Sequence, residues 1–138
     1  MTGAASAGLG PGWKLLWVCA GSALGGGARY LVALLGVAVF GQGFAVGTLV
    51  VNVLGSFLMA AIAQAALLSP GFDPDLRLVL TTGVLGGFTT YSAFNQETVV
   101  ALQRGARGLA AINVGLTLLL CLGAGWLGIV AGRWFAAR

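Results

Sequence analysis

A run of polar and aromatic residues lies inside one of the long hydrophobic segments of this sequence, between Gly83 and Glu97. It places hydroxyl, amide and carboxyl side chains among glycines and aromatic rings, where a membrane-spanning segment would ordinarily be apolar. Lipid cannot form hydrogen bonds with such groups, so they must face protein, water or a solute. This run is therefore where we expect a polar pathway for a small solute.

Several side chains in and near this run could line such a pathway. Tyr91 and Phe94 are three positions apart and share one face of a helix, and the positive edges of their rings suit a small anion. Each polar group could instead serve only to join helices through packing or an interhelical hydrogen bond. The candidate donors to a solute are Asn52, Ser92, Asn113 and Thr117.

Apart from the basic residues at the segment ends, two charged residues lie within the hydrophobic segments, where a charge is costly. Arg29 follows a run of glycines, and Glu97 is the one carboxylate within any of these segments. They could form a structural ion pair with each other or extend towards the membrane surface. Otherwise they border water-filled vestibules, in which Arg29 would attract anions.

The composition indicates an integral membrane protein with a single domain over residues 1–138. Hydrophobic residues make up 59% of the chain, charged residues make up 7%, and the mean hydropathy is +0.99. Soluble domains carry about a quarter charged residues. The hydrophobic tracts have the length of about 20 residues that a helix needs to cross a bilayer, and they lack the alternating pattern of barrel strands. The sequence predicts four spanning helices, at about 13–39, 44–68, 76–102 and 109–134.

The third predicted helix is not expected to be continuous. Gly86 and Gly87 are followed closely by Thr89 and Thr90, and both residue types lower helix propensity. A break in the middle of the membrane would free backbone carbonyls, and converging carbonyls can replace the water shell of a cation. The alternative is a kink that the neighbouring helices tolerate.

The charge distribution only weakly favours one orientation in the membrane. An even number of helices places both termini on one side, with Lys14, Arg77, Arg133 and Arg138. Arg104 and Arg107 lie on the other side, and a clear excess of Lys and Arg normally marks the cytoplasmic side. The sequence therefore does not choose one orientation, and insertion in both orientations with pairing of inverted copies is a hypothesis that it allows. Glycines along all four helices favour a compact bundle that dimerises.

Other classes of protein fit this sequence poorly. The links between the predicted helices are too short to hold a water-soluble domain, and no cleavable signal peptide is evident. There is no histidine and no pair of carboxylates for acid–base catalysis, so we do not expect an enzyme. The basic residues lie near helix ends, which fits lipid headgroups better than nucleic acid. Cys19 and Cys121 are interpreted as small apolar packing residues.

In the polar and aromatic residues of its second and third predicted helices, the chain resembles the Fluc family of fluoride channels, which is also called CrcB. The resemblance covers all four predicted helices and is most specific in residues 47–52 and 86–94. It implies an antiparallel, dual-topology homodimer in the bacterial inner membrane, with two pathways for passive fluoride export that reduce fluoride toxicity in the cytoplasm. It also implies a central sodium ion held by the backbone carbonyls of Gly86 and Thr89. The pathway residues implied are Asn52, Tyr91, Phe94, Asn113 and Thr117, with Glu97 as the acid of the third helix.

The chain departs from the family pattern at a few of these positions. Tyr91 replaces the first of two pathway phenylalanines, which keeps the ring edge and adds a hydroxyl. Asn113, Thr117 and Cys121 occupy positions of the fourth helix that are often tyrosine or serine, and the thiol is a weaker donor. Two other readings remain: a small proton-coupled cation exporter with dual topology, and a scaffold protein whose polar residues only join helices.

Overall fold

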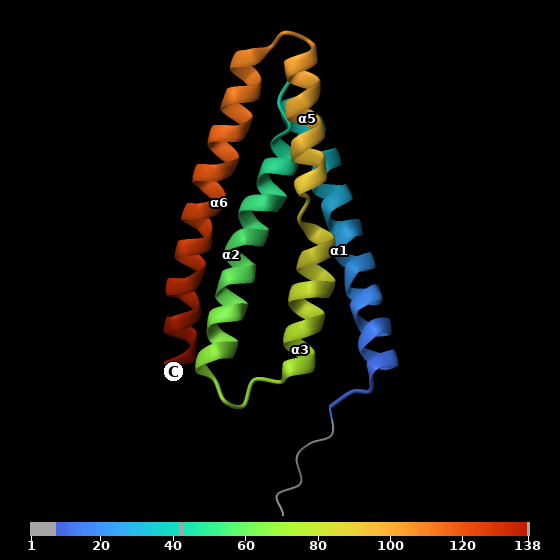
Figure 1. Cartoon of the computed structure of the whole chain (residues 1–138), viewed down its shortest axis with the longest axis vertical. Helices are drawn as coiled ribbons and strands as arrows, with labels where there is room; N and C mark the ends of the chain where they lie inside the picture. Colours follow the sequence, from blue (N-terminus) through green and yellow to red (C-terminus); the bar gives the residue numbers. More distant parts are fainter. Residues whose placement is uncertain (1–7, 42, 138) are drawn as a thin grey trace, which may run out of the picture.

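The computed structural model describes residues 8–41 and 43–137, and all regular structure within these ranges is helical. The chain reverses direction at each link along the long axis of the molecule, so that the link between α2 and α3 lies at the same end as the start of α1 and the end of α6 (Figure 1). The predicted all-α fold is confirmed. The elements in chain order are α1 (Pro11–Phe40), α2 (Val46–Leu68), α3 (Pro74–Leu78), the π-helix η1 (Val79–Leu85), α4 (Gly86–Phe88), α5 (Tyr91–Gln103) and α6 (Arg107–Ala136).

Three of these helices are long and apolar enough to cross a membrane: α1, α2 and α6. They correspond to the first, second and fourth of the predicted spanning helices and make the chain a multi-pass membrane protein. The region predicted as the third spanning helix, residues 76–102, consists of α3, η1, α4 and α5 in succession. Asp73 caps the start of α3, with Pro74 as its first residue, and the chain leaves helical geometry at Thr89 and Thr90.

Glycines allow the helices to pack backbone against backbone. α2 lies beside α6, where a side chain added at Gly128 would collide with the carbonyl of Phe57. On the other side of the molecule, a side chain at Gly25 of α1 would collide with the carbonyl of Val84 in η1. Close approach through small residues is the usual way in which membrane helices associate. The first contact joins α2 to α6, and the second holds the interrupted third segment against α1.

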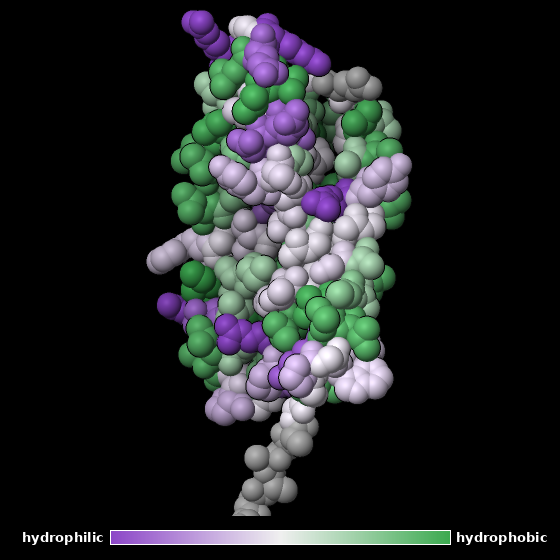
Figure 2. All heavy atoms as spheres, turned by 45° about the vertical axis from the view of Figure 1, so that its right-hand side comes forward, coloured by the Kyte–Doolittle hydropathy of each residue, from purple (hydrophilic) through white to green (hydrophobic). Residues whose placement is uncertain are grey.

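The surface of the described chain is largely hydrophobic. Large side chains of α1 and α6 are exposed, among them Leu24 and Leu119, each at 72% of full exposure. Figure 2 shows hydrophobic atoms along the flanks and hydrophilic atoms towards both ends, with some between them. Such a surface is stable only against lipid or another apolar surface, in agreement with a membrane protein.

A charged cluster joins α1 to α3 at the opposite end of the molecule from the α5–α6 link. Asp75 lies 2.7 Å from the ammonium group of Lys14, and its carboxylate accepts a hydrogen bond of 2.6 Å from the backbone N–H of Leu9. The bond from Lys14 and then that from Leu9 lower the pKa of Asp75 below its ordinary value. The pairing neutralises Lys14, which reduces the charge difference between the two ends. Arg138, which contributed to that difference, lies outside the described residues.

Candidate functional site

The candidate site is built around the break between α4 and α5. Thr89 and Thr90 are both extended, with φ and ψ of −82° and 158° for Thr89 and −152° and 110° for Thr90. Thr90 caps α5, because its hydroxyl accepts a hydrogen bond of 3.2 Å from the N–H of Ala93. The break therefore separates two helical segments, and the second segment has an ordinary N-terminal cap.

The side chain of Asn52, on α2, pairs with both backbone groups of Thr90. Its Oδ1 accepts a bond of 2.8 Å from the Thr90 N–H, and its Nδ2 donates one of 3.0 Å to the Thr90 carbonyl. In a continuous helix the Thr90 N–H would instead donate to the carbonyl of Gly86. The amide of Asn52 thus satisfies two groups that the break exposes, and the Gly86 carbonyl loses its helical donor.

Two further contacts fix the position of Thr89. Its methyl group packs against Gly55 of α2 so closely that any side chain at position 55 would collide with it. Its carbonyl accepts a hydrogen bond of 3.4 Å from the Nη1 atom of Arg29, on α1. Residues from both neighbouring helices therefore hold the break in place.

A hollow of about 410 Å³, here called the central hollow, lies beside the break between α2, α5 and α6. The rings of Tyr91 and Phe94 reach it with their centroids 5.7 Å apart and their planes tilted by 56°. Thr117 of α6 also lines it and is only 9% exposed. The hollow thus brings together four of the predicted pathway residues. Its lining includes Asn52, Thr90, Tyr91, Phe94, Thr117 and Cys121.

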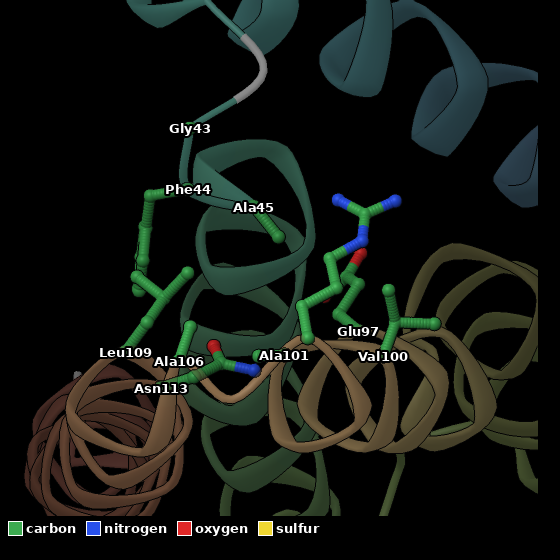
Figure 3. Close-up of a pocket in the computed structure, with 10 residues that line it drawn as sticks. Gly43, Phe44, Ala45, Glu97, Val100, Ala101, Ala106, Leu109 and Asn113 are labelled. Carbon is green, nitrogen blue, oxygen red and sulfur yellow. The ribbon is translucent and has the colours of Figure 1, made fainter.

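A second hollow, the outer hollow, lies between the start of α2, the end of α5 and the start of α6. Glu97 and Asn113 reach its lining from α5 and α6 (Figure 3), together with Arg104. Asn113 is 5% exposed and donates a hydrogen bond of 2.9 Å to the hydroxyl of Thr98, which donates one of 2.8 Å to the carbonyl of Phe94. This chain of hydrogen bonds connects the outer hollow to the aromatic residues of the central hollow.

Only one of the two carboxyl oxygens of Glu97 has a hydrogen-bond partner in the described chain. Its Oε1 accepts a hydrogen bond of 2.5 Å from the hydroxyl of Thr48. Its Oε2 is buried and has no hydrogen-bond partner among the residues that the structure describes. Glu97 also lines a third hollow together with Arg29, but within the described ranges these two residues form no ion pair with each other.

Not every predicted pathway residue lies in the same hollow. Ser92 is exposed and is absent from the lining of the hollows described above; its hydroxyl lies 3.2 Å from that of Thr90. Asn113 lies in the outer hollow, one helical turn from Thr117. Sequence reasoning missed the contacts of Thr48 and Thr98, although the spacing of Thr98 four residues after Phe94 is a signal for the bond that it makes to that carbonyl.

These features define a helical, multi-pass membrane protein in which an interrupted helix borders polar hollows. A family model described as CrcB-like protein, Camphor Resistance (CrcB), matches residues 16–129. The chain belongs to this family, and the resemblance drawn from the sequence is confirmed.

Individual relatives match over most of their length. The chain is 50% identical over 123 residues to a protein of Anaeromyxobacter dehalogenans (strain 2CP-1 / ATCC BAA-258) named fluoride-specific ion channel FluC, covering 89% of this chain and 98% of the relative. It is 45% identical over 120 residues to a protein of the same name from Sorangium cellulosum (strain So ce56), covering 87% and 94%. A protein so named from Geobacter sulfurreducens (strain ATCC 51573 / DSM 12127 / PCA) is 44% identical over 119 residues, covering 86% and 96%.

Proposed function

We propose that this protein is a fluoride-selective ion channel that releases fluoride passively from the cell and so lowers its toxicity in the cytoplasm. The observation that carries the proposal is the central hollow, where Asn52, Phe94 and Thr117 meet beside the break. The relatives named as fluoride-specific channels supply the identity of the ion. The protein is accordingly not an enzyme.

The side chains of the two hollows can replace the water around a small anion. Fluoride is strongly hydrated, so a conducting path must offer donors at each step and still release the ion. The hydroxyl of Thr117 makes no hydrogen bond to the described residues, so it is free to donate. An asparagine amide has two N–H groups, and the bonds seen for Asn52 and Asn113 use one each.

The proposed path runs from the outer hollow to the central hollow. Arg104 and Arg29 carry positive charge at hollows that Glu97 also lines, and positive charge raises the local concentration of an anion. The ion then passes along α6 from Asn113 to Thr117, with the ring edges of Phe94 and Tyr91 on the other side. Ser92 lies at the exposed end of this path, beside the break.

The proposal includes a fourth membrane crossing and a dimer. α3, η1, α4 and α5 together have the length of a span, and we place their break at membrane depth. Two copies would pair in antiparallel orientation in the inner (plasma) membrane of the cell. Support comes from the exposed hydrophobic surface, the weak charge difference between the two ends, and Tyr91, which is 77% exposed beside the break.

The dimer is proposed to hold a sodium ion through the carbonyls of Gly86 and Thr89. These groups suit a hard cation, which prefers oxygen ligands. Gly86 is exposed and its carbonyl has lost its helical donor, while the Thr89 carbonyl accepts one long bond of 3.4 Å and has a second lone pair available. Bound sodium would supply a fixed positive charge that holds the two copies together.

Purified protein in liposomes provides the test of the channel function. Vesicles loaded with fluoride should release it rapidly once a potassium gradient with an ionophore sets a voltage, as recorded with a fluoride-selective electrode. Chloride-loaded vesicles recorded with a chloride-selective electrode, and fluoride-loaded vesicles without protein, are the controls, and neither should show release. Absence of fluoride release would reject the proposal, and proton-driven uptake of an organic cation would support the exporter instead.

A further inference from the structure

The central hollow contains sulfur as well as oxygen and nitrogen. Cys121 of α6 is a free, partly exposed cysteine in its lining, and Met59 of α2 lies in the same lining. The other free cysteine of the described chain, Cys19, is exposed on α1 and lies outside this lining. A hollow that handles a hard anion has no need of a thiol and a thioether, since both are poor hydrogen-bond donors.

Thr117 supplies an independent sign that this part of the hollow can take a ligand. It lies four residues before Cys121, so the two side chains share one face of α6. It is 9% exposed and borders the hollow, yet its hydroxyl makes no hydrogen bond to any residue that the structure describes. The thiol and this unpartnered hydroxyl therefore border the same space.

We propose that the central hollow is a binding site for soft monovalent cations such as Ag⁺ or Cu⁺, with Cys121 as its principal ligand. Thiolate and thioether ligands select soft metal ions, and Met59 and Thr117 are the neighbouring groups that could assist. The metal takes the place of the thiol proton: Cys–SH and Ag⁺ give Cys–S–Ag and H⁺, with no change of oxidation state. Metal binding to a cysteine releases a proton in this way.

Occupancy of the site should stop ion flow, a consequence that rests on the proposed function. Cys121 lines the same hollow as Phe94 and Asn52, so a metal bound there would lie in the path of fluoride. Silver bound to Cys121 should therefore inhibit fluoride flow through the protein.

Fluoride release from proteoliposomes in chloride-free nitrate medium tests the inhibition, with silver nitrate as the probe. Wild-type protein should lose flux by about tenfold or more at saturating silver, because its thiolate binds soft metals tightly, and excess dithiothreitol should restore it. Cys121→Ser should keep its flux in silver, whereas the matched control Cys19→Ser should be inhibited like the wild type. Met59→Leu should need a higher silver concentration for the same inhibition.

Silver binding to the detergent-solubilised protein, measured by native mass spectrometry, tests the site without relying on conduction. Cys121→Ser, or Cys121→Ala if the serine variant folds poorly, should bind one silver ion fewer per chain than wild type. Equal binding by wild type and the Cys121 variants would overturn the site, and so would equal inhibition of both. If untreated wild-type vesicles release no fluoride, the channel function fails and the binding measurement alone decides whether the metal site exists.

Discussion

Replacing Asn52 by alanine should loosen the break between α4 and α5. The Asn52 side chain makes both hydrogen bonds that tie Thr90 to α2, at 2.8 and 3.0 Å. Alanine is compatible with the helix around position 52, so the substitution removes these bonds without disturbing α2 itself. The effect should therefore be confined to the segment that Asn52 holds.

The structure sets the size of this effect. A hydrogen bond contributes about 1 kcal/mol net, so the loss of two costs about 2 kcal/mol, or roughly a thirtyfold change in the opening equilibrium. Thr90 is only 8% exposed, so water cannot fully replace the lost partner. An unsatisfied buried group adds about 1–3 kcal/mol, which makes thirtyfold the lower end of the expected range.

Hydrogen exchange of the Thr90 amide provides the assay, alongside fluoride release from vesicles. In Asn52→Ala the exchange of peptides that contain Thr90 should accelerate by about thirtyfold or more, and fluoride release should fall. Ser56→Ala is the matched control, because the Ser56 hydroxyl lies in the same hollow but bonds only to the Asn52 carbonyl within α2. Unchanged exchange at Thr90 in Asn52→Ala would refute the assigned role of the side chain.

Three other substitutions test separate parts of the structure. Phe94→Ile removes a ring edge from the central hollow, so fluoride release should fall sharply while size-exclusion chromatography shows an unchanged assembly; undiminished release would reject the role of the ring. Thr98→Val leaves the Asn113 amide without its partner, which should cost about 1–3 kcal/mol in denaturant unfolding and slow release; wild-type stability and release would count against the connection between the hollows. Asp75→Asn should lower thermal stability at neutral pH, because Lys14 and Leu9 hold the folded-state pKa below its ordinary value of 3.8. That contribution is present above the ordinary pKa and is lost as the pH falls through the lower folded-state value, so variant and wild type should converge in strong acid; a difference that persists there would contradict this origin.

The long apolar helices could be predicted from the sequence because hydrophobic length alone specifies them. α1, α2 and α6 need only some 20 apolar residues each to be recognised. The weak point of the third segment was also visible, since glycines and threonines disfavour a helix at residues 86–90. The π-helix η1 carries no comparable signal, because its residues would also suit an α-helix; in the structure it packs closely against Gly21 and Gly25 of α1.

The partners of the polar side chains could not be predicted from the sequence. The sequence allowed Asn52 to join helices through a hydrogen bond, but its partner is the backbone of Thr90, which any residue type could supply. Glu97 bonds to Thr48, 49 positions away in the sequence. Such pairs depend on how three helices are placed relative to one another, and helical periodicity describes only one helix at a time.

The hydrogen-bond pairing of polar groups also helps to distinguish a channel from a scaffold protein. In a scaffold protein, the polar side chains within the membrane would all have hydrogen-bond partners on neighbouring helices, as the Thr48 hydroxyl does. The Oε2 atom of Glu97 and the hydroxyl of Thr117 have no such partner in the described chain. Of these two groups, only the Glu97 oxygen is a buried atom, and burying a polar group without a hydrogen bond costs roughly 2–7 kcal/mol. Glu97 and Thr117 border hollows on the proposed path, so unpaired polar groups along it fit a conducting role better than a purely joining one.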